Sequence, residues 1–333
     1  MLELRDFQLD PANDAPEINH EFSEGQISVV LGRNASGKTR LCRLIAGLDN
    51  TPGSIVLDGE DISSLNPRKR SVALVYQAFV NYPNFSVYEN LASPLVAQGV
   101  KRAQIDDRVR ELAFQLELEP LLERLPDSLS GGQQQRVAIG RALAQSARVL
   151  LLDEPLVNLD YKLREALEFR LRELLISSRV TVIYTTSDPK DAFSLGDEVL
   201  LLDNHQLLQS GKPLDIYRKP TSFAAANLMS DPGVNVWRGR AVPEYVRPEH
   251  LSLTAKGNEV AEYPVTVTGL ETNGSETFVH ARALNEHWVA KVAGLKTVAV
   301  GEKISFFTAN DNVLRFEKRR GGKDSRGDKE SCG

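Results

Sequence analysis

The stretch LSGGQQQRVAIGRALAQSARVLLLDEP, from Leu129 to Pro155, decides the fold of this chain. It joins a pair of glycines, Gly131 and Gly132, to an apolar run, Val149–Leu152, that ends in two acids, Asp153 and Glu154. Taken separately, a Gly-Gly pair is usually a turn, and a strand that ends in acids is common at a protein surface. Their meaning depends on a second glycine-rich stretch that lies upstream.

The upstream stretch is GRNASGKT, which follows the template G-x-x-x-x-G-K-[ST] of a phosphate-binding loop. An apolar strand pattern, Ile27–Leu31, precedes it and a helical leucine pattern follows it, and the motif requires both flanks. Glycines let backbone N–H groups approach phosphate oxygens, and the N-terminus of the helix adds a favourable dipole. These flanks weaken the alternative interpretation, a glycine-rich turn with a solvated lysine. The predicted phosphate-binding residues are Gly32, Arg33, Asn34, Ala35, Ser36, Gly37, Lys38 and Thr39.

The acidic strand supplies the remaining groups that phosphoryl transfer needs. Ligands of open α/β sheets bind at the C-terminal edge of the strands, where Asp153 and Glu154 stand. We expect Lys38 to reach the β- and γ-phosphates of ATP, and Thr39 and Asp153 to hold Mg²⁺. Glu154 is placed to polarise the attacking water. Without the upstream loop, this pattern would more often be a strand that ends at the surface. The predicted cofactors are ATP and Mg²⁺.

Composition excludes several classes of protein. The net charge of −5 over 333 residues argues against a general nucleic-acid binder. No apolar run approaches the roughly 20 residues that span a bilayer, and the N-terminal stretch lacks the features of a signal peptide. The cysteines, Cys42 and Cys332, suit a reducing cytosol. We therefore expect a cytosolic protein that can dock on a membrane through a partner.

The hydrophobic pattern predicts two domains and a tail. Short apolar strands alternate with helical patterns in residues 1–230, which indicates a largely parallel sheet between helices, with a helical subdomain at about 85–147. Residues 231–317 show β-alternation with a hairpin signal at Asn273-Gly274, which indicates a small β-barrel or sandwich. Residues 318–333 are expected to be disordered. The strands expected in the first domain are Ile27–Leu31, Val72–Val75, Val149–Leu152, Val180–Tyr184 and Glu198–Leu202.

Together these motifs resemble the ATP-binding cassette (ABC) ATPases, over residues 1 to about 317. Val75-Tyr76-Gln77 is similar to the Q-loop of this family, whose glutamine senses Mg²⁺ and water and whose following segment touches membrane subunits. LSGGQ is similar to the signature motif, and Asn158-Leu159-Asp160 to the D-loop, which crosses a dimer interface. In this family two cassettes sandwich ATP, with the phosphate loop of one facing the signature of the other. The resemblance implies an α/β P-loop NTPase fold, with Gln77 as a catalytic and metal-contacting residue. It adds as nucleotide-contacting residues Ser130, Gly131, Gly132, Gln133 and Asp160.

A finer resemblance points to the ATPase subunits of carbohydrate importers of the maltose and glycerol-phosphate type. It rests on LDIYRKPTSFAAANLMS, residues 214–230, and on VRPEHLSL, residues 246–253, which is similar to their regulatory β-domain, called TOBE. YQAFVNYPNFSVYENLASPL, residues 76–95, resembles subunits of bacterial glycerol importers that use two different ATPases. The implied partners are two transmembrane permeases, a second ABC ATPase subunit (identical or different) and, indirectly, an extracytoplasmic solute-binding protein. No nucleic-acid partner is expected. The implied location is peripheral, on the cytoplasmic face of the inner membrane.

The chain departs from the family at two positions. Ser187 occupies the place of a histidine that contacts the γ-phosphate, and a serine hydroxyl is shorter and neutral. The stretch Leu9-Asp10-Pro11-Ala12 lacks the aromatic residue on which the family stacks adenine, and we expect Phe7 to lie in the core. His205 is expected to be a solvated residue in a hairpin turn. None of the histidines lies near Ser187 in sequence: His20, His205, His250, His280 and His287.

These departures leave two interpretations open. The substitutions are harmless sequence drift, or the ATP site of this chain hydrolyses poorly and a different partner cassette supplies the competent site. The predicted function is an ATP-hydrolysing subunit that powers import of glycerol or a related polyol or sugar. The alternative is a catalytically weakened partner subunit with a mainly structural or regulatory role. ABC ATPases of DNA repair carry long coiled coils, and translation-associated ones carry two cassettes and a basic linker; this chain has neither pattern.

Overall fold

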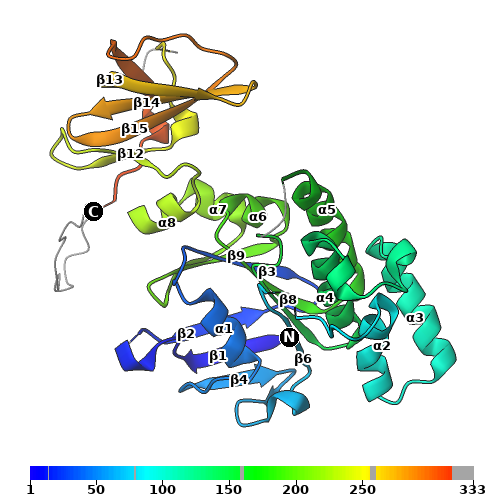
Figure 1. Cartoon of the computed structure of the whole chain (residues 1–333). Coiled ribbons are helices and arrows are strands. Elements are labelled where there is room, and N and C mark those ends of the chain that lie inside the picture. Colours follow the sequence, from blue (N-terminus) through cyan, green and yellow to red (C-terminus); the bar gives the residue numbers. More distant parts are fainter. Residues whose placement is uncertain (14, 79, 158–160, 256–259, 317–333) are drawn as a thin grey trace. The chain divides into compact units, whose positions relative to one another are not determined.

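The computed structural model describes residues 1–13, 15–78, 80–157, 161–255 and 260–316 (Figure 1). Contacts divide the chain into two compact units, Met1–Met229 and a second that begins at Ser230. The expected tail at 318–333 and the segment Asn158-Leu159-Asp160 lie outside the described residues.

The first unit is built around a six-stranded sheet with the strand order β10-β9-β3-β8-β7-β6. Neighbouring strands from β9 to β6 are parallel, and β10 pairs antiparallel with β9. The strands predicted from the sequence are all present, although the one expected at Val180–Tyr184 begins at Thr181 and continues to Thr186. The bounds are β3 Ile27–Gly32, β6 Val72–Val75, β7 Val149–Asp153, β8 Thr181–Thr186, β9 Glu198–Asp203 and β10 Gln206–Gly211.

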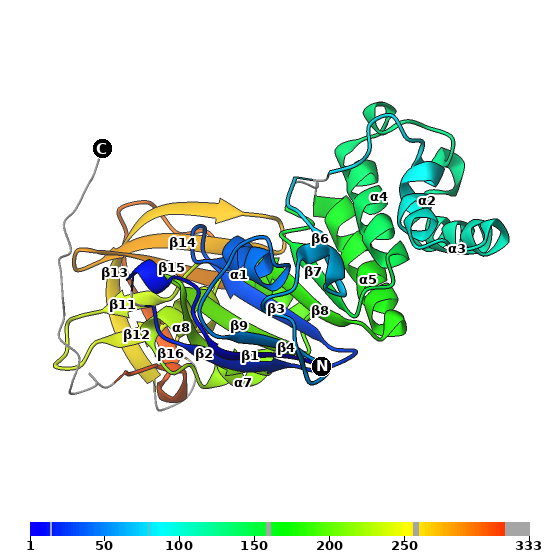
Figure 2. The same ribbon diagram turned by 90° about the horizontal axis from the view of Figure 1, so that it is seen from below.

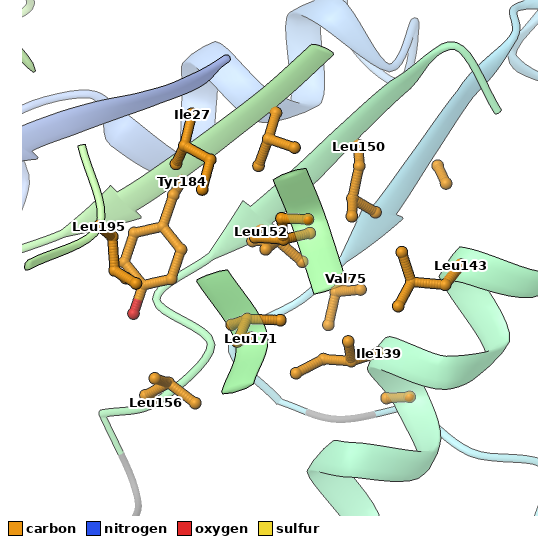
Figure 3. Packing of buried hydrophobic residues seen from close by; sticks show 14 of the residues in the cluster. Ile27, Val75, Ile139, Leu143, Leu150, Leu152, Leu156, Leu171, Tyr184 and Leu195 are labelled. Carbon is orange, nitrogen blue, oxygen red and sulfur yellow. The ribbon is translucent and has the colours of Figure 1, made fainter. Parts of the chain in front are cut away.

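Both faces of this sheet are buried. Within β7, Leu150 and Leu152 belong to one buried hydrophobic cluster and Leu151 belongs to another. The first cluster includes Ile139 of helix α4 (Gly131–Ala144) and Leu171 of helix α5 (Tyr161–Ser178), which lie around Leu152 in Figure 3. A parallel strand that is covered on both faces must be apolar at every position, because neighbouring side chains point to opposite sides. The continuous run VLLL therefore reflects burial on both faces.

A second, antiparallel sheet and helix α1 contribute to the other cluster. The sheet has the order β2-β1-β4-β5, with β1 Leu2–Phe7, β2 Ile18–Phe22, β4 Ser54–Leu57 and β5 Glu60–Asp61. The helices of the first unit are α1 Lys38–Ile45, α2 Val87–Ala97, α3 Arg102–Gln115, α4 Gly131–Ala144, α5 Tyr161–Ser178, α6 Pro189–Ser194, α7 Pro213–Arg218 and α8 Phe223–Leu228. Short 3₁₀ helices are η1 Pro11–Asn13, η2 Pro67–Lys69, η3 Glu119–Leu121 and η4 Pro126–Ser128. Figure 2 shows α2, α3 and α4 grouped at one end of the unit, beyond β6 and β7.

The second unit consists mainly of antiparallel strands. Its sheets have the orders β11-β12 and β15-β14-β13-β16. At the expected hairpin, Asn273 Oδ1 accepts hydrogen bonds from the N–H groups of Ser275 and Glu276, and Gly274 has a φ of 93°. The bounds are β11 Asn235–Trp237, β12 Glu244–Val246, β13 Val260–Thr272, β14 Glu276–Ala283, β15 Glu286–Ala293 and β16 Lys303–Ala309, with 3₁₀ helices η5 Pro248–His250 and η6 Asn310–Asn312. The expected fold class, an α/β P-loop unit followed by an all-β region, is confirmed.

Within the described part of the chain, no helix combines the length and the apolarity that crossing a membrane requires.

Candidate nucleotide-binding site

A pocket of about 640 Å³ lies where β3 and β7 end and α1 begins. It brings together most of the predicted phosphate-loop residues with Gln77, which follows β6, and with Glu154, which follows β7. The carboxyl ends of parallel strands meet at one edge of a sheet, so residues far apart in sequence converge there. The lining residues are Asn34, Ala35, Gly37, Lys38, Thr39, Arg40, Arg43, Asp49, Gln77, Glu154 and His205.

The loop from Gly32 to Gly37 depends on its two glycines. Gly37 has a φ of 106°, a conformation that residues with a side chain rarely adopt. A Cβ atom on Gly32 would lie 2.5 Å from the carbonyl oxygen of Leu202 on the neighbouring strand β9. Ser36 donates its N–H to the carbonyl of Arg33 at 3.1 Å, which closes the turn. The loop therefore ends with backbone N–H groups at the N-terminus of α1, where an anion is favoured.

Lys38 is buried, with 4% of its side chain exposed, and it is the first residue of α1. Its ammonium donates hydrogen bonds to the carbonyl oxygens of Gly32, at 2.8 Å, and Arg33, at 2.9 Å. It also lies 3.1 Å from Oε1 of Glu154. A buried ammonium beside free N–H groups makes the pocket suitable for a polyphosphate anion.

Thr185 of β8 organises the end of β7. Its hydroxyl donates to Oδ1 of Asp153 at 2.8 Å, in keeping with the register that pairs these residues. The N–H of Glu154 donates to the same hydroxyl at 3.0 Å. Glu154 has a φ of 46°, so the chain turns sharply there and its carboxylate reaches Lys38. One carboxylate thus stays in the buried strand and the next faces the phosphate loop.

The residues expected to hold Mg²⁺ fit that ion. Thr39, Gln77 and Asp153 offer hydroxyl, amide and carboxylate oxygens, which are the hard donors that Mg²⁺ prefers. The carboxylate of Asp153 has lone pairs beyond the one that accepts from Thr185. In the described residues, no group of three or more His, Cys, Asp or Glu could hold a metal ion.

Ser187 lies at the same edge of the sheet but does not line the pocket. It follows Thr186, whose partner in the β3–β8 register is Leu31, directly before the phosphate loop. Its side chain is exposed. The turn after it is held by Arg164 of α5, which contacts Asp188 at 3.0 Å and Asp191 at 2.5 Å.

The signature residues lie apart from this pocket. Ser130 caps the N-terminus of α4, where its N–H donates to Oε1 of Gln133 at 2.9 Å and its hydroxyl accepts from the N–H of Gln133 at 3.4 Å. This capping box explains how the LSGGQ stretch starts a helix. Ser130, Gly131, Gly132 and Gln133 do not line the pocket with Lys38. Asp160, the remaining predicted contact, lies outside the described residues.

The expectation that His205 is a solvated residue in a hairpin turn is met only in part, because 32% of its side chain is exposed and the rest is covered. The hairpin turn is present, with positive φ at Asn204 (46°) and His205 (61°) between β9 and β10. However, the N–H of His205 donates to the carbonyl of Ser36 at 3.0 Å, and its side chain lines the pocket. Because β9 pairs with β3, this turn reaches the phosphate loop. No local pattern in the sequence signals that pairing. Phe7, as expected, is fully buried.

Comparisons with known proteins agree with this geometry. A family model described as "ABC transporter" matches residues 16–157. The chain is 32% identical to the sn-glycerol-3-phosphate import ATP-binding protein UgpC of Pectobacterium atrosepticum, over 91% of this chain and 93% of that protein. It is 34% identical to the alpha-glucoside transport ATP-binding protein AglK of Rhizobium meliloti, over 90% of this chain and 92% of that protein.

Solved structures show the same cassette. The ATP-binding cassette MJ0796, solved as a dimer bound to ADP and phosphate, matches with a TM-score of 0.57 at 26% identity, over 64% of this chain and 99% of MJ0796. For cbiO1 of Clostridium perfringens, the TM-score is 0.60 at 24% identity, over 68% of this chain and 94% of cbiO1, and this likeness concerns the fold. The chain belongs to the ABC transporter family, as an ATP-binding subunit with ATPase activity.

Proposed function

We propose that this chain hydrolyses ATP in the pocket around Lys38 to drive solute import through a membrane transporter. The observation that carries the proposal is the convergence of the phosphate loop, Gln77 and Glu154 in one pocket. Relatives named for import of sn-glycerol-3-phosphate and transport of alpha-glucosides match nearly the whole chain. We therefore place its solute among polyols, polyol phosphates and small sugars.

Each residue of the pocket has a proposed role. The loop N–H groups and Lys38 hold the β- and γ-phosphates, and Thr39, Gln77 and Asp153 bind the Mg²⁺ that accompanies the nucleotide. The ion, when bound, neutralises charge on the phosphates. Glu154 orients a water molecule for attack on the γ-phosphorus and accepts its proton as the bond to the β-phosphate oxygen breaks. The products are ADP and inorganic phosphate.

The site is proposed to be completed by a second cassette, identical or different. Ser130, Gly131, Gly132 and Gln133 lie outside their own chain's pocket, so they are free to face a nucleotide held by a partner. Asp160 belongs to the same proposed interface. The segment after Gln77 is proposed to contact two permeases on the cytoplasmic face of the membrane. In this segment Val80, Tyr82 and Phe85 are exposed. Residues 231–317 form the proposed regulatory domain.

The test of this function is transport by the assembled complex. The chain, its partner cassette, two permeases and a solute-binding protein would be reconstituted in vesicles with ATP, and uptake of labelled sn-glycerol-3-phosphate, glycerol and maltose would be compared. We expect one solute to stimulate ATP hydrolysis and to accumulate, and both effects to disappear with Lys38→Ala. ATP hydrolysis that no solute stimulates, in a complete complex, would contradict the proposal.

A second candidate is a catalytically weakened subunit, and the observation that favours it is Ser187, which is exposed and does not line the pocket. Replacing Ser187 by histidine restores a longer side chain that can reach a γ-phosphate. If the site is weakened, Ser187→His raises the turnover of the complex by up to about 10²-fold, because one positioned donor to the transition state contributes on that scale. Ser187→Ala is the matched control. Equal turnover in all three proteins would show that the serine is harmless.

A further inference from the structure

His205 lies on the side of the phosphate loop opposite to Glu154. In the strand order β9-β3-β8-β7, the loop leaves β3, the turn with His205 leaves β9, and Glu154 leaves β7. Strands of a sheet lie about 4.8 Å apart, so the two residues approach the loop from opposite directions. Glu154, which pairs with Lys38, marks the end of the pocket where the γ-phosphate belongs. His205 marks the other end.

The imidazole of His205 packs directly on the loop. Its Cδ2 atom lies 2.8 Å from the point that a Cβ atom on Gly37 would occupy. The backbone hydrogen bond from His205 to the carbonyl of Ser36 fixes the turn against the loop. The side chain keeps 32% of its surface exposed, and it lines the pocket. One part of the ring is therefore held by protein while another part faces the space that a ligand would enter.

Asp10 lies close to the imidazole of His205. This residue is buried, and its Oδ2 accepts a hydrogen bond from Asn13 at 2.6 Å and lies 3.8 Å from Nδ1 of His205. Its Oδ1 lies 3.6 Å from Nη1 of Arg40, which follows Thr39 on α1. The hydrogen bond from Asn13, assisted by the nearby Arg40 and His205, lowers the pKa of Asp10. The carboxylate is therefore charged at neutral pH and places a negative charge near the imidazole.

We propose that His205 provides the flat surface on which the adenine base of the bound nucleotide stacks. This inference rests on the proposed binding of ATP in the Lys38 pocket. With the γ-phosphate toward Glu154, the nucleoside leaves the loop on the side of β9, beside Arg40. Of the described residues that line the pocket, His205 alone carries a ring. Stacking of a base on an aromatic side chain needs only the π-face that every base has.

The experiment measures the contribution of the base to binding separately from that of the phosphates. Binding of MgATP and of magnesium tripolyphosphate to the purified full chain is measured by calorimetry, for the wild type, His205→Ala and His205→Phe. We expect His205→Ala to weaken ATP binding about tenfold, as the loss of one stacked base does, and to leave tripolyphosphate binding unchanged. His205→Phe restores ATP binding because it restores the ring. His287→Ala, an exposed histidine of the second unit, is the control and binds both ligands as the wild type does.

Three results would overturn the inference. If His205→Ala weakens both ligands equally, the imidazole contacts phosphate rather than the base. If it weakens neither, the ring makes no contact with the nucleotide. If His205→Phe binds ATP as weakly as His205→Ala does, a polar contact of the imidazole is responsible and stacking is not. Failure of the proposed ATP binding gives a different pattern, because the wild type itself would then bind neither MgATP nor magnesium tripolyphosphate. Thermal melts of each variant show that its fold is kept.

Discussion

The ammonium of Lys38 and the carboxylate of Glu154 lie 3.1 Å apart, with 4% and 12% of their side chains exposed. This buried pair joins the phosphate loop to the end of β7. Breaking a buried pair by removing one partner leaves an uncompensated charge. A bound triphosphate offers Lys38 other negative oxygens, so phosphate and Glu154 compete for the same ammonium. The residue proposed to hold the phosphates and the residue proposed to orient water are thus coupled before any reaction.

The first prediction concerns Glu154→Gln. Glutamine keeps the size of the side chain but cannot accept a proton or hold the ammonium as an ion pair. We expect the rate of ATP hydrolysis to fall by about 10²–10⁴-fold, the usual contribution of a general base. Binding of MgATP should not weaken, because Lys38 loses its competitor. Single-turnover hydrolysis and equilibrium binding measure the two effects.

Glu60→Gln is the control for this substitution, since Glu60 is an exposed acid on β5 away from the pocket. Glu60→Gln should change neither the rate of ATP hydrolysis nor the affinity for MgATP. Glu154→Gln with unchanged hydrolysis would show that another group activates the water.

The second prediction concerns Gly37→Ala. The φ of 106° is strained for alanine, and the new Cβ atom would lie 2.8 Å from the ring of His205. We expect ATP affinity to fall by more than tenfold because the loop N–H groups shift. Gly59→Ala is the matched control, because Gly59 also has a positive φ, 85°, with nothing within 4 Å of its Cβ position.

Gly59→Ala should lower the free energy of unfolding by about 1–2 kcal/mol, the cost of a left-handed residue, without altering ATP binding. Nucleotide titrations and chemical denaturation of both variants measure these effects. Equal ATP affinities in the two variants would show that the loop tolerates a side chain at residue 37.

The third prediction concerns Glu244 of β12, which is buried with 2% of its side chain exposed. Burial raises its pKa, but hydrogen bonds from Arg315, Tyr263 and Arg240 outweigh that effect and hold the pKa below its ordinary value of 4.5. Its contribution to stability is therefore present above pH 4.5 and is lost as the pH falls through the lowered value. Glu244→Gln should remove this pH dependence and lower the free energy of unfolding at neutral pH by about 1–2 kcal/mol, because the two arginines that pair with Glu244 are nearly half exposed.

Tryptophan fluorescence during denaturation measures this change, because the two tryptophans of the chain, Trp237 and Trp288, both belong to the second unit. The control is Glu286→Gln, which removes a more exposed ion pair with Arg238 and should cost at most about 1 kcal/mol. If Glu244→Gln retained the acid sensitivity of the wild type, other carboxylates would be responsible for it.

The fourth prediction concerns Cys42 of α1, which is fully buried. Burial, with a smaller contribution from the charge of Asp153, raises the pKa of its thiol well above the ordinary value. In a Cys332→Ser variant, we expect no reaction with a thiol reagent at pH 8 until the protein opens, since the thiolate is the reactive form. MgATP at about 100 times its dissociation constant should slow the reaction about 100-fold further, because it stabilises the closed state. Rapid labelling of the native protein would contradict this placement of the thiol.

Much of the first unit could be predicted from the sequence because its signals are local. The run Val149–Leu152 is apolar at every position, which burial on both faces requires, and the structure confirms it as a strand that continues to Asp153. The phosphate loop fixes the spacing of Gly32, Gly37 and Lys38 along the chain, so the sequence motif is sufficient to identify them. The end of β8 was predicted two residues early because threonines at 185 and 186 are less apolar than the strand before them. Their hydroxyls donate hydrogen bonds to the carboxylates of Asp153 and Asp191.

The sequence by itself determined the chemistry of the phosphate loop and the acids at the end of β7, because each depends on residues that are neighbours in the chain. Only the tertiary structure decided which residues from other strands meet them. Because β9 pairs with β3, His205 lies against Gly37. Because β8 pairs with β3, Ser187 lies at the edge of the sheet where Gly32 begins the loop. Strand order and register arise from packing of the whole sheet, and no short pattern around His205 or Ser187 encodes them.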